Sequence, residues 1–196
     1  MTRKIYILAI IILTSLCIKA QNNMTNTFEK TTWESLNDNA IRMIGKDWML
    51  IGAGTKEQGF NMMTASWGGM GWLWEKPVSF IFVRPQRYTY QFTERENYYT
   101  VCFFSEEHRE ALKICGSKSG RDCDKVKESG LTPIFTPSGC VAFEEAVIIL
   151  ECKKLYAGKI EESNFVDAEV VKSKYPNKDF HKMYVGEIVN VWKKKQ

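Results

Sequence analysis

Two consecutive runs decide the fold: WMLIGAG at residues 48–54 and FNMMTASW at residues 60–67. Each has the length and apolar content of a β-strand, and the polar segment TKEQG (55–59) between them contains a glycine suited to a tight turn. This spacing predicts a β-hairpin. A nucleotide-binding loop at the GxG of residues 52–54 is rejected, because the third glycine is out of register and no βαβ unit follows.

Further strand-like runs, rich in β-branched and aromatic residues, follow the hairpin. They are VSFIFV (78–83), YYTVCFF (98–104), CVAFEEA (140–146), VIILECKKLYAGKI (147–160) and HKMYVGEIVNVWKK (181–194). The alternation of the last run slips near Gly186, as a β-bulge would cause. Short helices are predicted within residues 27–45, at 87–96 (helix or turn), at 105–116 ending with Gly116, and at 123–129. Six or more strands with short inserted helices favour a single closed, mainly β barrel over a parallel doubly wound sheet.

Length and charge limit the classes of protein that the sequence can encode. The chain has 196 residues, of which 44% are hydrophobic, enough for one substantial core and too few for two ordinary domains. Its net charge of +4 comes from 27 basic and 23 acidic residues. No basic stripe with interleaved aromatic residues runs through the body of the chain, so nucleic acid is not expected as a partner.

The first 20 residues have the pattern of a signal peptide. Arg3 and Lys4 precede an apolar run from Ile5 to Cys17, and the polar part of the chain begins at Gln21. The run is shorter than the roughly 20 apolar residues that a membrane-spanning helix needs. We therefore expect cleavage after Ala20, a periplasmic or secreted mature protein, and no stable membrane insertion after cleavage.

Five cysteines remain after residue 20, and their number and spacing favour free thiols. They are Cys102, Cys115, Cys123, Cys140 and Cys152. An odd number argues against a fully paired disulfide framework. No CxxC is present, and the two histidines, His108 and His181, lack finger-like spacing to any cysteine, so no metal site is predicted. Small buried or half-buried thiols are the expected role.

Three polar stretches are candidate ligand loops. The first, NMMTASWGGMGW, is the end of a predicted strand followed by a glycine-rich turn at Gly68, Gly69 and Gly71. Its polar and aromatic residues are Asn61, Thr64, Ser66 and Trp67. Hydroxyl and main-chain amide groups here could approach an anion or a planar ring. RPQRYT places Arg84, Arg87 and Thr89 directly after a strand, a set that suits a phosphate monoester. CGSKSGRDCDK joins two predicted helices and could reach a ligand or a partner subunit; its polar residues are Ser117, Lys118, Ser119, Gly120 and Arg121, followed by Asp122, Asp124 and Lys125.

On the residues alone, the first stretch could equally be an ordinary strand end with a flexible loop. Solvated surface arginines are the more ordinary reading of RPQRYT, although Pro85 stiffens that segment, and the charge alternation of CGSKSGRDCDK could reflect solvation.

The sequence offers no nucleophile with a matching base. With two histidines, one of them in a predicted surface helix, neither a Ser-His-Asp nor a Cys-His arrangement is supported. No catalytic residue is therefore assigned. Such a chain is typical of a protein in which a cofactor performs the chemistry.

Taken together and in this order, NMMTASW, RPQRYT, CGSKSGRDCDKVKESGLTP, LECK and YVGEIV resemble the flavin reductase-like family of FMN-binding split barrels, which includes flavoredoxin. The similarity covers about residues 45 to 192, and SGRDCDK with the following GLTP is its most specific element. The resemblance implies three segments, namely a signal peptide (1–20), a lead-in (21–44) and a mainly β split barrel with short inserted helices (45–196).

The resemblance also implies a homodimer with non-covalent FMN near the subunit interface. Thr64, Ala65, Ser66 and Trp67 would line the flavin, with Asn61 at the same strand, while Arg87 and Thr89 would hold its phosphate. Arg84 and Tyr88 would be neighbours of that phosphate, and Ser119, Gly120 and Arg121 would lie near the isoalloxazine or across the dimer. Cys115 and Cys152 fall where the family commonly has structural cysteines.

The implied function is that of an FMN-binding oxidoreductase of the flavin reductase or flavoredoxin type. Its electrons would come from NAD(P)H or from a redox protein, and the predicted export favours the latter, because reduced nicotinamides are not expected outside the cytoplasm. Two alternatives stay open: a non-catalytic flavin-binding or storage protein of the cell envelope, and a secreted β-barrel binding module without flavin.

Overall fold

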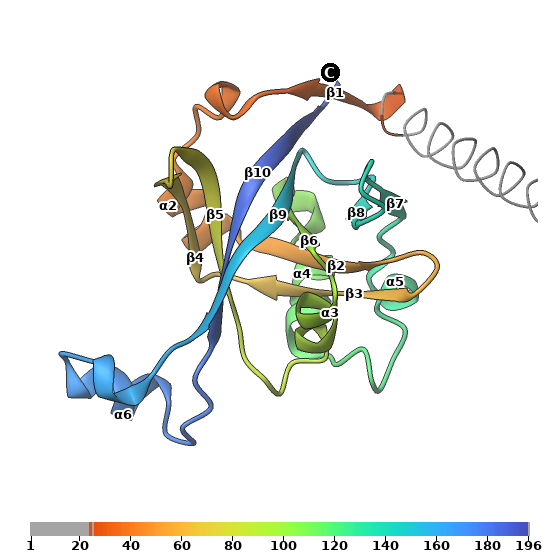
Figure 1. The fold of residues 1–196 in the computed structure, drawn as a ribbon. Coiled ribbons are helices and arrows are strands. Elements are labelled where there is room, and N and C mark those ends of the chain that lie inside the picture. The colour runs from red at the N-terminus through yellow and green to blue at the C-terminus, as the bar shows by residue number, and fades with distance from the viewer. Residues whose placement is uncertain (1–23, 25, 196) are drawn as a thin grey trace, which may run out of the picture.

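The computed structural model describes residues 24 and 26–195, and it is built on the hairpin at its centre (Figure 1). Strands β2 (Met49–Thr55) and β3 (Gly59–Ala65) pair antiparallel, with Met49 opposite Ala65, as the two runs predict. The predicted signal peptide lies outside the described residues. No helix in the part of the chain that the structure describes has the length and apolarity needed to span a bilayer.

Eight strands form one antiparallel sheet. Along it the order is β3-β2-β6-β9-β10-β5-β4, and β1 adds to the end of β10. The remaining strands are β1 (Phe28–Thr31), β4 (Gly68–Leu73), β5 (Lys76–Val83), β6 (Tyr98–Phe103), β9 (Ile148–Lys159) and β10 (Lys182–Lys194), with β7 (Pro133–Phe135) and β8 (Val141–Phe143) as a separate hairpin. Within the described strands, β3, β4 and β1 each pair on one side only, so the sheet does not close on itself through hydrogen bonds, in contrast to the closed barrel that the strand count favours.

The helices are short and sit in the connections. They are α2 (Ala40–Arg42), α3 (Thr89–Arg95), α4 (Arg109–Ser117), α5 (Lys125–Ser129) and α6 (Ala168–Lys174), with the π-helix η2 (Met43–Asp47) and the 3-10 turns η1 (Trp33–Ser35), η3 (Glu106–His108) and η4 (Glu162–Asn164). Gly116 does not end α4. A Cβ there would lie 3.3 Å from Thr64 Cβ, so this glycine lets the helix pack closely on β3.

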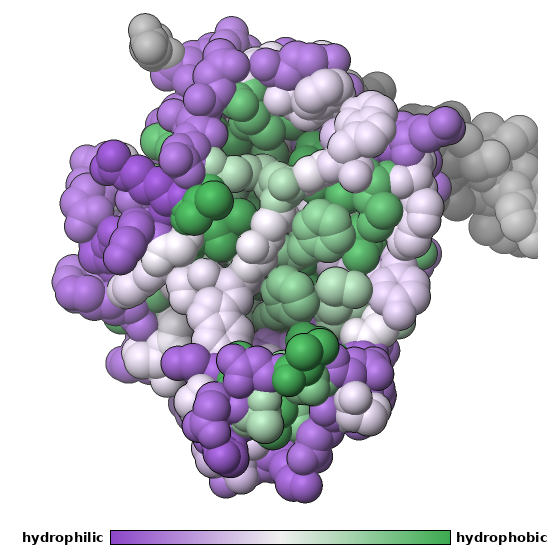
Figure 2. Space-filling view, turned by 90° about the vertical axis from the view of Figure 1, so that its left-hand side faces the viewer, coloured by the Kyte–Doolittle hydropathy of each residue, from purple (hydrophilic) through white to green (hydrophobic). Residues whose placement is uncertain are grey.

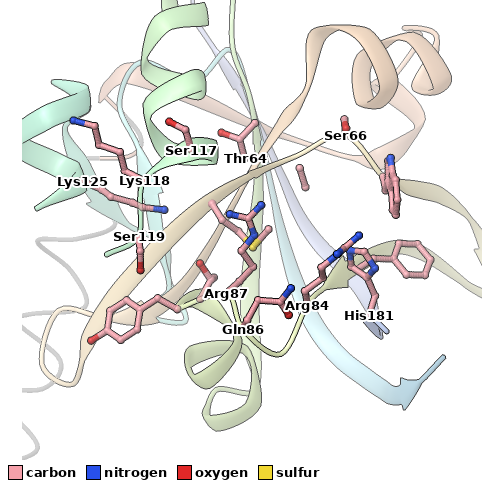
Figure 3. Close-up of a pocket in the computed structure, with 16 residues that line it drawn as sticks. Thr64, Ser66, Arg84, Gln86, Arg87, Ser117, Lys118, Ser119, Lys125 and His181 are labelled. Atoms are coloured by element: carbon pink, nitrogen blue, oxygen red, sulfur yellow. The ribbon is translucent and has the colours of Figure 1, made fainter. Parts of the chain in front are cut away.

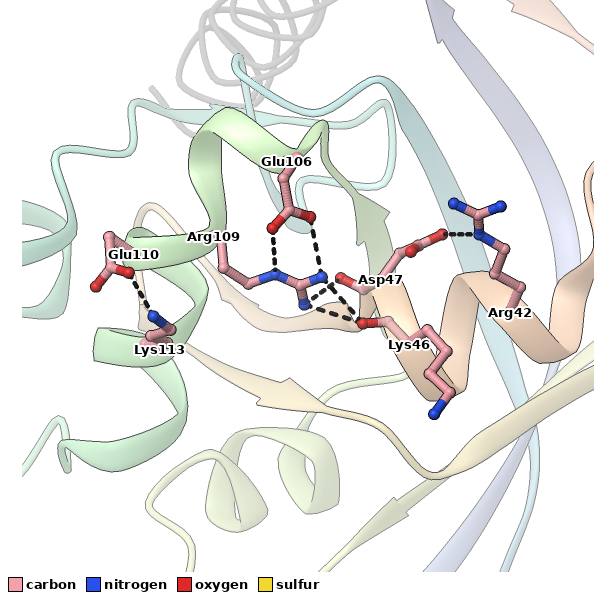
Figure 4. A network of polar contacts seen from close by, with 7 residues as sticks. All are labelled: Arg42, Lys46, Asp47, Glu106, Arg109, Glu110 and Lys113. Atoms are coloured by element: carbon pink, nitrogen blue, oxygen red, sulfur yellow. Dashed lines mark hydrogen bonds and ion pairs between the residues drawn. The ribbon is translucent and has the colours of Figure 1, made fainter.

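Arg109 fixes the start of α4 to the segment before β2. Its guanidinium donates to Lys46 O at 3.0 Å and to Asp47 O at 3.2 Å, and it pairs with Glu106 at 3.0 Å (Figure 4). The same group stacks over the Trp48 ring at 4.4 Å. Charge-assisted bonds to two carbonyls hold the helix in one position relative to the hairpin. This matters for function because the loop after α4 lines the site described below.

The long β9–β10 ribbon is bulged where the sequence slips. Its register shifts between Val185 and Gly186, which confirms the predicted bulge. A Cβ on Gly186 would lie 2.5 Å from the hydroxyl oxygen of Tyr99, a side chain that is only 2% exposed. Gly186 is therefore the residue that lets β10 pass over a buried aromatic ring.

Two parts of the chain differ from the sequence-based expectation. Residues 28–31, expected in a lead-in with a short helix, form β1 and pair with the chain end, Phe28 opposite Lys194. The glycine-rich turn predicted at residues 68–71 is wrong, because these residues form β4, with Gly68 opposite Ile81 of β5. A Cβ on Gly68 would lie 2.6 Å from Met49 Cε, so the glycine serves close packing within a strand.

The cysteines are buried or half-buried free thiols, as their number and spacing predict. Cys102, Cys115, Cys140 and Cys152 are buried, Cys123 is half-buried, and all five carry free thiols. Burial raises the pKa of Cys102 and of Cys152 to about 12. At neutral pH these two thiols are protonated and chemically inert, as buried cysteines usually are.

Candidate functional site

A polar cavity of about 570 Å³ opens where four segments meet (Figure 3). These are the end of β3, the β5–α3 connection, the α4–α5 loop and the residue that precedes β10. Figure 3 shows Arg87 in the middle, Lys125 and Ser119 to one side, and Arg84 and His181 to the other. We call this space the main cavity. Its volume is typical of a small-molecule or cofactor site.

The part of the main cavity that runs from Arg87 toward Lys125 is cationic, and we call it the cationic end. Arg87 is exposed, and its guanidinium donates one bond, to Gly116 O at 3.1 Å, which leaves most of its planar fork available. Thr89 is 1% exposed and its hydroxyl accepts from Asn61 Nδ2 at 2.9 Å, so the hydroxyl proton can be donated to a ligand. These groups form a ready site for a phosphate.

Lys125 adds a buried ammonium to this end. It is 5% exposed, and its Nζ donates to Met62 O at 2.9 Å and to Cys115 O at 2.8 Å. Burial lowers the pKa of Lys125, because an ammonium loses hydration in the interior. An anion placed in the cavity would offset that cost. Lys125 belongs to the candidate loop CGSKSGRDCDK, but the sequence did not assign it a role toward the flavin.

The other end of the main cavity is bordered by the edge strand β3. Thr64 Oγ1 donates to Leu112 O at 2.5 Å, which ties the strand end to α4. Ser66 and Trp67 are exposed beyond it. Because β3 is the last strand of the sheet, one side of its backbone faces outward and can offer amide and carbonyl groups to the rim of a planar ring.

Arg84 anchors the segment 160–181, which we call the arm. Its Nη1 pairs with Asp179 at 2.5 Å, its Nη2 donates to Lys174 O at 2.9 Å, and its guanidinium stacks over Tyr175 at 5.4 Å. Gln86 also donates to Asp179. Arg84 lines the cavity, as its sequence position suggested, but its donors are used to hold the arm.

The arm delivers His181 to the cavity wall. The side chain is 8% exposed, its Nδ1 lies 2.9 Å from the Tyr175 hydroxyl oxygen, and its ring contacts Trp67 at 5.2 Å between centroids. Burial, with the positive charges of Arg84 and Arg87, lowers the pKa of His181 from 6.5 to about 4, against an opposing effect of Asp179. At neutral pH His181 is therefore an uncharged hydrogen-bonding group.

This shift predicts a pH dependence of folding stability. The unfolded chain takes up a proton near pH 6.5 and the folded chain near pH 4, so the contribution of neutral His181 is complete above pH 6.5 and is lost as the pH falls toward 4. Between pH 7.5 and pH 5 the wild type should lose about 1–2 kcal/mol more than His181→Gln. Urea denaturation of both proteins at the two pH values measures the difference. Equal losses would show that His181 is solvated in the native state.

The structure brings most of the predicted site residues together. Thr64, Ala65, Ser66, Trp67, Arg84, Arg87, Tyr88, Thr89 and Ser119 line the main cavity. Asn61 and Gly120 line a second cavity next to it, which Tyr88 also borders. Arg121 lies over the Tyr88 ring at 5.0 Å and donates to Gln86 O at 3.0 Å. Their roles toward a ligand stay a prediction.

Four lining residues were not predicted from the sequence, namely Met63, Phe82, Gln86 and His181. Ser117, Lys118 and Lys125 also line the cavity; they belong to the predicted loop CGSKSGRDCDK but were not assigned to the flavin. Met63 and Gln86 stand inside quoted motifs, so those motifs could have included them. His181 gave no local signal, because the arm that positions it folds back through contacts to residues far away in the chain.

Comparison with known proteins identifies the family of this fold. The chain matches the family model described as flavin reductase like domain over residues 41–196. No curated protein matches it significantly. Among solved structures, flavoredoxin of Desulfovibrio vulgaris (Miyazaki F) superposes with a TM-score of 0.60 at 21% identity, covering 84% of this chain and 78% of that one.

Two further structures are similar to the same degree. Flavoredoxin from Methanosarcina acetivorans gives a TM-score of 0.59 at 20% identity, covering 76% of this chain and 69% of that one. An FMN-binding protein from Thermus thermophilus gives 0.58 at 20% identity, covering 74% and 70%. These likenesses establish the mainly β split barrel that the motifs predicted. The chain belongs to the flavin reductase-like domain family.

Proposed function

We propose that the chain is a flavin-dependent oxidoreductase that binds FMN non-covalently in the main cavity and passes electrons through it. The observation that carries the proposal is the polarity of this cavity: a cationic end at Arg87, Thr89 and Lys125, and a strand edge at Thr64–Trp67. FMN has the same polarity, with a phosphate dianion at one end and a flat hydrogen-bonding ring at the other.

The residues at the cationic end fit the phosphate by charge and geometry. Arg87 offers two parallel N–H groups, Thr89 offers a hydroxyl whose acceptor side is already occupied by Asn61, and Lys125 keeps one N–H beyond its two carbonyl contacts. At the ring end, Ala65 and Ser66 offer backbone groups and Trp67 an exposed apolar face. In this proposal Arg84 has a structural role, because its guanidinium holds the arm through Asp179 and Lys174 O.

Bound FMN would supply the redox chemistry, accepting and donating electron pairs, and the chain would orient it and limit water access. His181 is neutral at pH 7 and can donate or accept one hydrogen bond at Nε2, since Nδ1 faces Tyr175. Its role is thus one of positioning a ligand at the ring end. No catalytic residue of this chain is assigned.

The electron donor is NAD(P)H or a redox protein. Because the signal peptide predicts export, we favour a redox partner outside the cytoplasm. Efficient FMN reduction by NADH at low micromolar concentration, together with cytoplasmic residence of the protein, would overturn that preference.

The experiment is an absorbance spectrum of residues 21–196 after incubation with FMN and desalting, followed by anaerobic NADH. Retained flavin that bleaches rapidly and turns over with an acceptor supports a nicotinamide-driven reductase. Retained flavin that NADH leaves oxidised, but that a reduced redox protein bleaches catalytically, supports the electron-carrier form. Stoichiometric binding of FMN without turnover with either donor favours the storage alternative. If no FMN is bound even at saturating concentration, the flavin proposal is refuted.

We also propose that the chain forms a homodimer through the side on which β4 and β5 lie. Figure 2 shows hydrophobic residues gathered over the middle of this side, with hydrophilic residues around them. Trp72 and Trp74 on β4 and its turn are 61% and 55% exposed, and Tyr156 on β9 is 47% exposed beside Trp74. A monomer rarely leaves such rings in solvent, and aromatic side chains are enriched at subunit interfaces.

The dimer proposal predicts a specific loss of association. Trp72→Glu should shift the protein toward the monomer in light scattering at micromolar concentration, because a carboxylate would have to be buried between the subunits. Val166→Glu, which replaces a fully exposed side chain of the arm, is the matched control. A wild type that is monomeric at all concentrations would contradict the proposal.

A further inference from the structure

The arm is held to the body of the molecule by few contacts. Its helices η4 and α6 contain no buried residue, Val166 is fully exposed, and Figure 1 shows α6 standing away from the rest of the sheet. Tyr175 and His181 are the only buried residues of the arm. The arm is therefore a peripheral segment whose position depends on a small number of side chains.

These side chains form one cluster, which we call the latch: Arg84 and Gln86 on the body, and Tyr175, Asp179 and His181 on the arm. Within the described chain, the hydrogen bonds from the body to the arm come from Arg84 and Gln86. His181 is the residue at which the arm joins β10, and its carbonyl accepts from Ile160 N at 3.0 Å, where the arm leaves β9. The latch thus includes the hinge of the arm.

The latch is also part of the wall of the main cavity. Arg84, Gln86 and His181 line this cavity, and Figure 3 shows Arg84 and His181 on the side away from Lys125. The ring of His181 contacts Trp67, which borders the ring end. A movement of the arm away from the body would remove this part of the wall. The position of the arm therefore decides how open the ring end is.

The charges around His181 make the latch sensitive to acid. Arg84 and Arg87 direct positive charge toward this ring, and the one carboxylate that opposes them, Asp179, is already paired with Arg84. Tyr175 carries no charge, because burial raises its pKa. Burial and the two arginines lower the pKa of His181 to about 4. Protonation of His181 is thus unfavourable while the arm is closed and is relieved when the arm opens into water.

Asp179 opposes this effect without cancelling it. Burial alone would raise the pKa of Asp179, but hydrogen bonds from Gln86 and Arg84 lower it overall, so the carboxylate stays ionised at pH 5. One of its oxygens, Oδ1, is buried without a hydrogen-bond partner in the described chain. If protonated His181 turned to this oxygen, acid would tighten the latch. The experiment below separates that result from opening.

We propose that the arm is an acid-operated lid: proton uptake by His181 releases the latch, and the arm moves away and opens the ring end of the main cavity. The opening itself needs no ligand. Its consequence, faster release of bound flavin, rests on the proposed function. An exported protein, which the signal peptide predicts, meets the pH of its surroundings directly, so this lid would retain flavin at neutral pH and release it in acid.

The first test measures hydrogen exchange in residues 21–196 without flavin, at pH 7.5 and pH 5, corrected for the intrinsic effect of pH on exchange. In the open arm His181 regains its ordinary pKa of 6.5, so the opening constant of the arm should rise about 30-fold between the two pH values. The amide of Ile160 is the reporter, because its bond to His181 O closes the hinge. Amides of the β6–β9 ladder should keep their protection.

Three variants test the latch. His181→Gln keeps a hydrogen-bonding side chain that takes up no proton, so the arm should open equally at both pH values. His108→Gln, at the other histidine of the chain, is the matched control and should keep the rise. Gln86→Ala removes an exposed side chain, and should raise the opening constant about three- to tenfold at both pH values without changing their ratio.

The second test measures flavin release. Riboflavin is the probe, because the phosphate of FMN itself takes up a proton near pH 6 or so, at about the pKa of a phosphate monoester. Dissociation of riboflavin from the loaded protein, followed by flavin fluorescence after dilution, should be about 10- to 30-fold faster at pH 5 than at pH 7.5 in the wild type. In His181→Gln the two rates should be equal.

The outcomes separate the lid from the flavin site. The inference is overturned if His181→Gln keeps the pH dependence of the wild type, if acid protects the arm amides, or if the arm and the β6–β9 ladder lose protection together, as in global unfolding. It is also overturned if the arm opens while bound riboflavin leaves at the same rate at both pH values. If the arm opens in acid but neither riboflavin nor FMN binds, the opening stands and the proposed function fails. If flavin binds and the arm stays closed, the function stands and the lid is wrong.

Discussion

Arg87→Ala is expected to weaken FMN binding by about 1.5–3 kcal/mol, a rise in Kd of roughly 10- to 150-fold, and to leave riboflavin binding unchanged. The reason is that Arg87 stands at the cationic end of the main cavity with most of its guanidinium unused by the protein, so its role is to meet the phosphate that only FMN carries. Parallel fluorescence titrations of the two ligands measure the selectivity. Equal weakening of FMN and riboflavin would remove the phosphate assignment.

Arg84→Ala is the matched control for that substitution. Both arginines line the main cavity, but Arg84 is paired with Asp179 and Lys174 O. Its removal should loosen the arm and affect FMN and riboflavin alike, because it acts through His181 at the ring end. Arg87→Lys should recover part of the FMN affinity, since it retains the charge and loses the planar fork.

The hairpin, the later strands and the bulge were predictable because their signals are local. Alternating or continuous apolar runs specify β2, β3, β5 and β6 within their own residues, and the slip at Gly186 marks the bulge of β10. The β1 strand was not predictable in this way. Its four residues, of which only Phe28 is apolar, pair with residues 191–194, and the segment 28–31 carries no local signal of that partner.

Glycine misled the prediction at β4 and at the end of α4. Gly68 and Gly116 look like breakers in the sequence, yet each is in a regular element that needs a missing Cβ, against Met49 in one case and Thr64 in the other. Packing between elements decides whether such a position requires glycine, and this packing cannot be read from a single sequence.

The candidate site was predictable where a motif stands on one loop and was missed where tertiary packing brings a residue in. Arg87 and Thr89 lie two residues apart in one motif, and the structure places both at the wall of the main cavity. His181 reaches the same cavity only because Arg84 and Tyr175 fold the arm back. Lys125 was named within a candidate loop, but its burial beside Arg87 was not predicted, because a lysine is rarely buried unless it is paired.

Gly186→Ala is expected to lower the free energy of unfolding by about 3 kcal/mol. The added methyl would lie 2.5 Å from the hydroxyl oxygen of Tyr99 and 2.7 Å from its Cζ. Tyr99 cannot move aside, because it is 2% exposed and its hydroxyl is 2.7 Å from Ser79 Oγ in the core of the sheet. Urea denaturation at pH 7 measures the loss.

Gly45→Ala is the control that separates this clash from the general effect of replacing glycine. Nothing lies within 4 Å of a Cβ at Gly45, which sits in the π-helix η2, so alanine there should leave stability unchanged or raise it by up to about 1 kcal/mol. If Gly186→Ala proved as harmless as Gly45→Ala, β10 could not cross Tyr99 as closely as described. The bulge that sets the register of β10, and with it the position of His181 at the cavity, would then need another cause.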